Sequence, residues 1–136
     1  MRTLLIVYHS MTGGTRQMAE AAARGAASEP GLRVRLLLAP DAQPADVLAA
    51  DGYLFAAPEN LAAIAGLMKD FFDRTYYVAL GRIEGRPYAA LVCAGSAAAT
   101  PHGRLSASAP AGVCGRWPSP LIVCNARIAS GVWRTR

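Results

Sequence analysis

The residues best suited to chemistry lie between positions 8 and 16, where the chain reads YHSMTGGTR. Hydroxyl groups donate hydrogen bonds to phosphate oxygens, and glycines allow the backbone to approach a ligand closely. The segment supplies both kinds of residue: Ser10, Thr12, Thr15, Gly13 and Gly14. It has neither the G-x-G-x-x-G pattern nor the G-K-[ST] ending of the common nucleotide loops. It therefore predicts a site for a phosphate monoester, held by hydroxyls and amides without a lysine.

The elements around this loop would place it at the start of a helix. Residues 3–8 form a near-continuous apolar run, as in a strand that is buried on both faces. Residues 16–27 are rich in good helix formers. The first N–H groups of a helix are unpaired and carry a partial positive charge, which attracts phosphate. The alternative is an ordinary turn and helix cap with no ligand.

The rest of the chain alternates strands with helices. Further strands are predicted at residues 34–38, 52–57, 88–93 and 121–124, and further helices at residues 44–50 and 65–77. This alternation is typical of an α/β fold, in which a parallel sheet is connected by right-handed crossovers. The length of 136 residues fits a single domain, 1–136.

Charge and composition exclude several classes of protein. The net charge of +5 arises after residue 96, because residues 1–96 balance nine basic against nine acidic residues, whereas residues 97–136 hold five arginines and no acid. That segment has no lysine and no basic cluster, so we expect no nucleic-acid partner. No apolar run is long enough to span a membrane or to act as a signal peptide, so we expect a cytoplasmic protein. The three cysteines show no metal-site or disulfide spacing.

Three segments resemble one family. Residues 10–15 (SMTGGT) resemble the phosphate loop of the flavodoxins. Residues 58–60 (PEN), followed by residues 66–74 (GLMKDFFDR), resemble the second flavin loop and the next helix of flavodoxin-like NAD(P)H-dependent FMN or quinone reductases. Residues 91–96 (LVCAGS) resemble the fourth strand and the third flavin loop. The matches are in the family's order, each after a predicted strand, and they cover residues 1–96.

The resemblance implies a flavodoxin-like doubly wound parallel sheet of strand order 2-1-3-4-5, with the ligand between strands one and three. It implies bound FMN, with NAD(P)H as co-substrate and a flavin or quinone as the acceptor. The implied FMN contacts are Ser10, Met11, Thr12, Gly13, Gly14 and Thr15 for the phosphate, Pro58, Glu59, Asn60 and Leu61 for the ring, and backbone N–H groups of Gly95 and Ser96 for its polar edge. No side chain is implied as acid, base or nucleophile, because the flavin carries the hydride and the electrons.

Two rival functions stay open. One is a non-enzymatic flavodoxin that passes single electrons between partners, and the other is a degenerate relative that no longer holds flavin. Pro58-Glu59 favours the reductase, because flavodoxins usually place an aromatic residue in that loop. We also expect Tyr76 and Tyr77 to pack in the core, with a contact to flavin or between copies of the chain as the alternative. For Glu59, a ring-facing acceptor and a solvated loop carboxylate are equally compatible with the sequence.

The segment after residue 96 departs from the family pattern. Prolines and glycines interrupt residues 97–119, so the expected helix cannot form there. We hypothesise a compensated reading-frame error in this segment. With permissible codons, residues 106–119 (SASAPAGVCGRWPS), read one base earlier, encode ERICAGWRLRPVAE, which resembles the family's helix. With only residues 125–136 after the last predicted strand, we expect the final helix to be missing or stunted, and FMN affinity and stability to be low.

Overall fold

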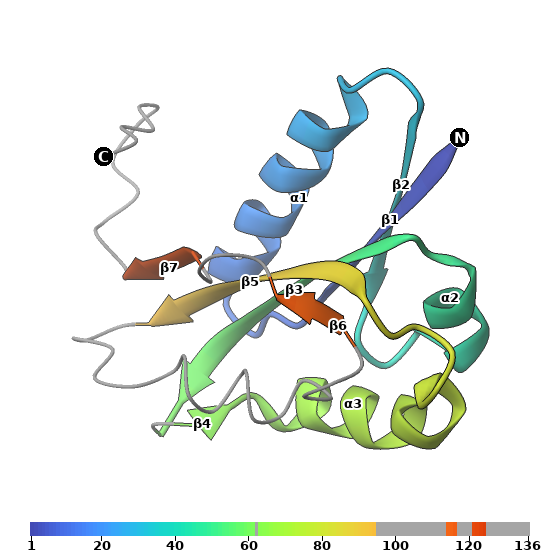
Figure 1. Cartoon of the computed structure of the whole chain (residues 1–136). Coiled ribbons are helices and arrows are strands. Elements are labelled where there is room, and N and C mark those ends of the chain that lie inside the picture. Colours follow the sequence, from blue (N-terminus) through green and yellow to red (C-terminus); the bar gives the residue numbers. More distant parts are fainter. Residues whose placement is uncertain (62, 95–113, 117–120, 125–136) are drawn as a thin grey trace.

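The computed structural model describes residues 1–61, 63–94, 114–116 and 121–124, with side chains up to residue 93 (Figure 1). The strands are β1 (Arg2–Tyr8), β2 (Leu32–Leu38), β3 (Gly52–Asn60), β4 (Ala63–Ile64), β5 (Arg86–Ala94), β6 (Cys114–Arg116) and β7 (Leu121–Cys124). The helices are α1 (Gly14–Ala27), α2 (Pro44–Ala49) and α3 (Gly66–Ala79). Each predicted element within the described residues is present, with its ends shifted by a few residues.

The sheet has the order β2-β1-β3-β5-β6, with β7 also paired to β5. All of these pairs are parallel, and only the short β4 runs antiparallel to its partner β3. The predicted first four strands correspond to β1, β2, β3 and β5, and their order is confirmed. The predicted fifth strand is β7, which lies beside β5 as expected.

Helices cover both faces of the sheet (Figure 1). On one face, Met18 and Ala19 of α1 pack against Ile6 of β1 and Ala56 of β3. On the other face, α2 and α3 cover the alternate residues of the same strands, including Val7 and Phe55. This alternation is what a parallel sheet that is buried on both faces requires, and it makes the fold doubly wound.

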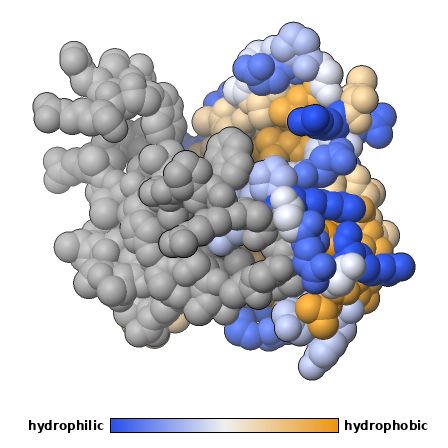
Figure 2. All heavy atoms as spheres, viewed as in Figure 1, coloured by the Kyte–Doolittle hydropathy of each residue, from blue (hydrophilic) through white to orange (hydrophobic). Residues whose placement is uncertain are grey.

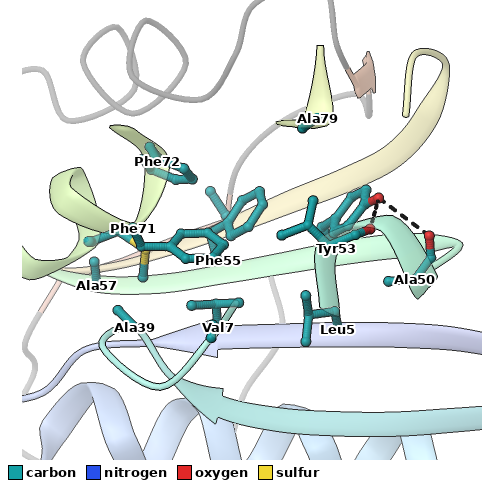
Figure 3. Packing of buried hydrophobic residues seen from close by; sticks show 14 of the residues in the cluster. Leu5, Val7, Ala39, Ala50, Tyr53, Phe55, Ala57, Phe71, Phe72 and Ala79 are labelled. Atoms are coloured by element: carbon teal, nitrogen blue, oxygen red, sulfur yellow. Dashed lines mark hydrogen bonds between the residues drawn. The ribbon is translucent and has the colours of Figure 1, made fainter. Parts of the chain in front are cut away.

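Aromatic packing holds α3 to the sheet (Figure 3). Phe55 of β3 meets Phe72 of α3 edge-to-face, with ring centroids 5.0 Å apart, and Phe71 lies 6.1 Å from Phe55 on the same side. Edge-to-face pairs of this kind stabilise a core beyond the effect of buried area alone. The predicted apolar spacing on this helix is confirmed, since Met68, Phe71, Phe72 and Thr75 are all buried.

The prediction that Tyr76 and Tyr77 pack in the core is wrong. Tyr77 is 84% exposed and Tyr76 is 39% exposed, and the two rings contact each other. The buried positions of α3 are already filled by residues that repeat at spacings of three and four, so the two tyrosines fall on the outer side.

Over the visible described surface, apolar residues are interspersed with charged ones (Figure 2). A contact between copies of the chain stays a prediction.

Two short strands were not predicted. β4 forms because β3 continues to Asn60, three residues beyond its predicted end, and then turns back on itself. β6 pairs with the first residues of β5, although its sequence lies in the segment interrupted by proline and glycine. Strands of two or three residues carry too little periodicity to be found from sequence.

Several expectations fall outside the described residues. These are the ring contacts at Gly95 and Ser96, the segment that carries the reading-frame hypothesis apart from β6, and the final helix. In the described part of the chain, no helix is long and apolar enough to cross a membrane, and no cluster of metal-ligating side chains occurs.

Candidate functional site

The strands that precede the predicted site segments end at one edge of the sheet. β1, β3 and β5 run parallel, so their carboxyl ends share this edge (Figure 1). Tyr8 at the end of β1 pairs with Ala56 of β3, and Pro58 of β3 pairs with Cys93 of β5. Ligands of open α/β sheets bind at this edge, where the strand order reverses. Here that reversal lies between β1 and β3.

The loop between β1 and α1 is shaped by a side chain and a glycine. The amide of Gly13 donates to the hydroxyl oxygen of Ser10 over 3.0 Å. Gly13 has a φ of 95°, a left-handed conformation that favours glycine, and it is the N-cap of α1. Glycine has no side chain to cap the helix, so the amides of the first turn keep their capacity to bind a ligand. The alternative of an ordinary turn without a ligand stays open.

Thr15 lies in the first turn of α1, and only 2% of its surface is exposed. A threonine hydroxyl can donate a hydrogen bond to a phosphate oxygen, as can the free amides of a first helical turn. Thr12 and Met11 are exposed on the same loop. The residues present therefore fit a phosphate group, as the sequence predicts.

Cys93 is a neighbour of the loop that sequence analysis did not identify. A Cβ atom on Gly14 would lie 3.5 Å from the Cys93 sulfur, in ordinary van der Waals contact. The thiol of β5 therefore packs beside the start of α1, on the same face as Leu91 and Met18. Sequence alone could not place it there, because residues 14 and 93 are joined only by tertiary structure.

The second predicted segment forms the end of β3 and its turn into β4. Glu59 pairs with Ile64 and Asn60 pairs with Ala63, so Leu61 lies at the tip. Leu61 has a φ of 52° and a fully exposed side chain. This left-handed conformation is strained for a residue other than glycine, and such strain collects at functional sites. Glu59 is partly exposed, but its carboxylate oxygen Oε2 is buried. The choice between a ring-facing acceptor and a solvated carboxylate stays a prediction.

The nearest cation to the phosphate loop is engaged elsewhere on α1. Arg16 donates to Glu20 over 2.7 Å, one helical turn further on. This hydrogen bond, and the charge of Glu20, raise the pKa of Arg16. The pair is exposed, so it contributes little to stability. Residues 10–15 hold no lysine or arginine.

Comparison with known proteins agrees with this geometry. Residues 39–111, more than half of the chain, match the sequence model of a family described as NADPH-dependent FMN reductase. A protein of Aquifex aeolicus named flavodoxin is 40% identical over 86 residues, covering 63% of this chain and 46% of its own length. An NAD(P)H dehydrogenase (quinone) of Acidithiobacillus ferrooxidans is 33% identical over 124 residues, covering 76% of this chain and 60% of its own length. The chain thus spans about half the length of the curated relatives it matches.

Solved structures show the same fold at low identity. The flavodoxin of Megasphaera elsdenii superposes with a TM-score of 0.66 at 19% identity, over 89% of this chain and 82% of that one. An NADH:FMN oxidoreductase in its apo form superposes with a TM-score of 0.61 at 20% identity, over 72% of this chain and 61% of that one. The fold is flavodoxin-like, and the chain belongs to the NADPH-dependent FMN reductase family.

Proposed function

We propose that this protein binds FMN and uses NAD(P)H to reduce a flavin or a quinone. The observation that carries the proposal is the first turn of α1, which follows the carboxyl end of β1, begins at the left-handed Gly13 and has no side-chain cap on its amides. The family, and relatives named for quinone and FMN reduction, support the same reading. Bound FMN would supply the hydride and electron chemistry, and the chain would bind and orient it.

The proposed FMN contacts follow the three segments at the edge of the sheet. Residues 10–15 would hold the phosphate through hydroxyls and helix amides. Residues 58–61 would lie along the ring, and the exposed apolar side chain of Leu61 would cover part of it. Backbone N–H groups of Gly95 and Ser96 would meet the polar edge of the ring, where they would stabilise negative charge.

Titration of FMN into the purified chain tests the binding site. We expect the fluorescence of FMN to be quenched on binding, and Thr15→Val to weaken the affinity about tenfold, because one hydrogen bond to a charged oxygen is lost. Thr75→Val is a matched control, since Thr75 is a buried threonine whose hydroxyl donates to the Phe71 carbonyl, away from the site. FMN that keeps its free-solution fluorescence at high protein concentration would contradict the proposal.

A second candidate function is that of an electron carrier, favoured by the relative named flavodoxin. NADPH oxidation by the FMN-loaded chain, followed at 340 nm with a quinone acceptor, separates the two. A reductase consumes NADPH with each turnover. A carrier takes electrons from a partner enzyme and leaves NADPH unoxidised.

A further inference from the structure

Arg16 stands at a position of α1 where a cation is unfavourable. It lies in the first turn, three residues after the N-cap Gly13, and this turn has no acidic residue. The unpaired amides of the first turn carry a partial positive charge, which repels a positive side chain. The helix by itself therefore gives no reason for an arginine here, whereas an anion bound to the same amides would attract one.

The ion pair of Arg16 has the weaker of the two possible orders. Its Nε donates to Oε1 of Glu20 over 2.7 Å, and the two side chains are 64% and 35% exposed. In a helix, an acid four residues before a base gives a stronger pair than a base four residues before an acid. Because the pair is also exposed, it can open at little cost in free energy.

Glu20 has a second arginine within reach on the same side of the helix. Arg24 follows it by one turn, is exposed, and forms no ion pair with the residues that the structure describes. Here the acid precedes the base, and Arg24 lies in the last turn, where the helix dipole favours a cation. Glu20 can therefore exchange Arg16 for Arg24 without being left unpaired.

Release from Glu20 would bring Arg16 within reach of the phosphate loop. Along the helix axis, Arg16 is only about 4.5 Å from Gly13. Side chains on a helix lean toward its N-terminus, so an extended arginine at this position extends past the first turn. The bond to Glu20 instead directs the guanidinium toward the next turn of the helix. Residues 10–15 have no cation of their own for the phosphate.

We propose that Arg16 leaves Glu20 to bind the phosphate of FMN, and that Glu20 then pairs with Arg24. The inference rests on the proposed function, because it requires FMN at the phosphate loop. A guanidinium forms charge-assisted hydrogen bonds with phosphate oxygens, which are stronger than those from a hydroxyl. Arg16 is thus a specificity-determining residue that favours FMN over riboflavin, and Glu20 and Arg24 are positioning residues.

Titrations of FMN and of riboflavin, which lacks the phosphate, isolate this contact. Each flavin is added to the full chain and followed by its fluorescence, for the wild type and for Arg16→Gln, Glu20→Gln, Arg24→Gln and the double variant Arg16→Gln/Glu20→Gln. These side chains are at least partly exposed, so the variants should fold. The matched control is Arg33→Gln, which removes the same charge from an exposed position of β2. Arg33 pairs with Thr3 near the amino end of β1, whereas the phosphate loop follows its carboxyl end.

We expect Arg16→Gln to weaken FMN binding about fivefold and to leave riboflavin binding unchanged. Glu20→Gln should tighten FMN binding about twofold, because Arg16 is then free, and the double variant should bind FMN as weakly as Arg16→Gln. Arg24→Gln should weaken FMN binding about twofold, because Glu20 then retains Arg16. These differences should shrink in about 0.5 M salt, and Arg33→Gln should match the wild type.

The outcomes separate this inference from the proposed function. If the wild type binds neither flavin, the proposed function itself fails. If it binds flavin, but Arg16→Gln has no effect or weakens FMN and riboflavin equally, only the role of Arg16 is overturned. An effect confined to the KM for NADPH would place the contact on the co-substrate and would also overturn that role. If Arg24→Gln binds FMN as Arg33→Gln does, the exchange of partners by Glu20 is overturned.

Discussion

At the scale of single residues, the site depends on the backbone freedom of Gly13. Its φ of 95° is accessible to glycine but strained for other residues. Gly25, in the same helix, has open space around its Cα and no such constraint. Substitution by alanine is therefore expected to change the free energy of unfolding in opposite directions at Gly13 and Gly25.

We expect Gly13→Ala to lower the free energy of unfolding by about 1–2 kcal/mol, through the strain of a left-handed alanine. Gly25→Ala should raise it by about 0.5–1 kcal/mol, because alanine loses less entropy in a helix. Chemical denaturation of both variants measures the two changes. Equal effects at the two positions would show that the conformation of Gly13 is not required.

A buried tyrosine provides the second residue-scale test. The Tyr53 hydroxyl lies 2.8 Å from the Val47 carbonyl and 3.3 Å from that of Ala50, at the end of α2 (Figure 3). Tyr53→Phe leaves these buried carbonyls with fewer donors, so we expect a loss of about 1–2 kcal/mol in unfolding free energy. Tyr77→Phe, on the exposed side of α3, should cost nothing measurable. Thermal melting of both variants checks the difference.

At the scale of elements, α3 is tied to the loop between β2 and α2 by one side chain. Arg74 donates to the carbonyls of Ala39 and Ala42, at 2.8 and 3.1 Å, besides its ion pair with Asp70. Lys69 makes only an exposed ion pair with Asp73 on the same helix. Lys69 therefore lies on the exposed face of α3, whereas the part-buried Arg74 connects the helix to the neighbouring loop.

We expect Arg74→Met to cost about 2 kcal/mol of unfolding free energy, because two carbonyls lose charged donors. Lys69→Met should cost less than about 0.5 kcal/mol, as is usual for an exposed pair one turn apart. Urea unfolding distinguishes them. Similar small losses would mean that Arg74 does not hold the loop.

At the scale of the whole molecule, the strand order determines where stability is concentrated. β1 and β3 have a parallel neighbour on each side, whereas β2 is an edge strand among the described strands. Amides in residues 5–7 and 55–57 should exchange with solvent only through global unfolding, and those of β2 should exchange faster. Hydrogen exchange detected by NMR measures this order. Equal protection of β2 would indicate that its outer edge is covered in solution.

FMN should also act on the whole fold. At a hundred times its dissociation constant, a ligand that binds only the folded chain adds about 2.7 kcal/mol of stability. A melting temperature that rises with FMN concentration would show this linkage.

The reading-frame hypothesis for residues 97–119 needs a separate test. Sequencing the gene and comparing it with close relatives decides it.

The sequence by itself determined the alternation of strands and helices, which follows from local periodicity and turn chemistry. The strand order followed from the resemblance to the flavodoxin-like family, and the role of residues 10–15 stays a prediction. Only the tertiary structure decided the burial of the Glu59 oxygen Oε2, the bonds of Arg74 to the β2–α2 loop, the packing of Cys93 beside Gly14 and the exposure of Tyr77. Some of these features depend on contacts between residues that are distant in sequence. Others depend on which side of a helix or strand faces the core. The local sequence pattern contains no information about either.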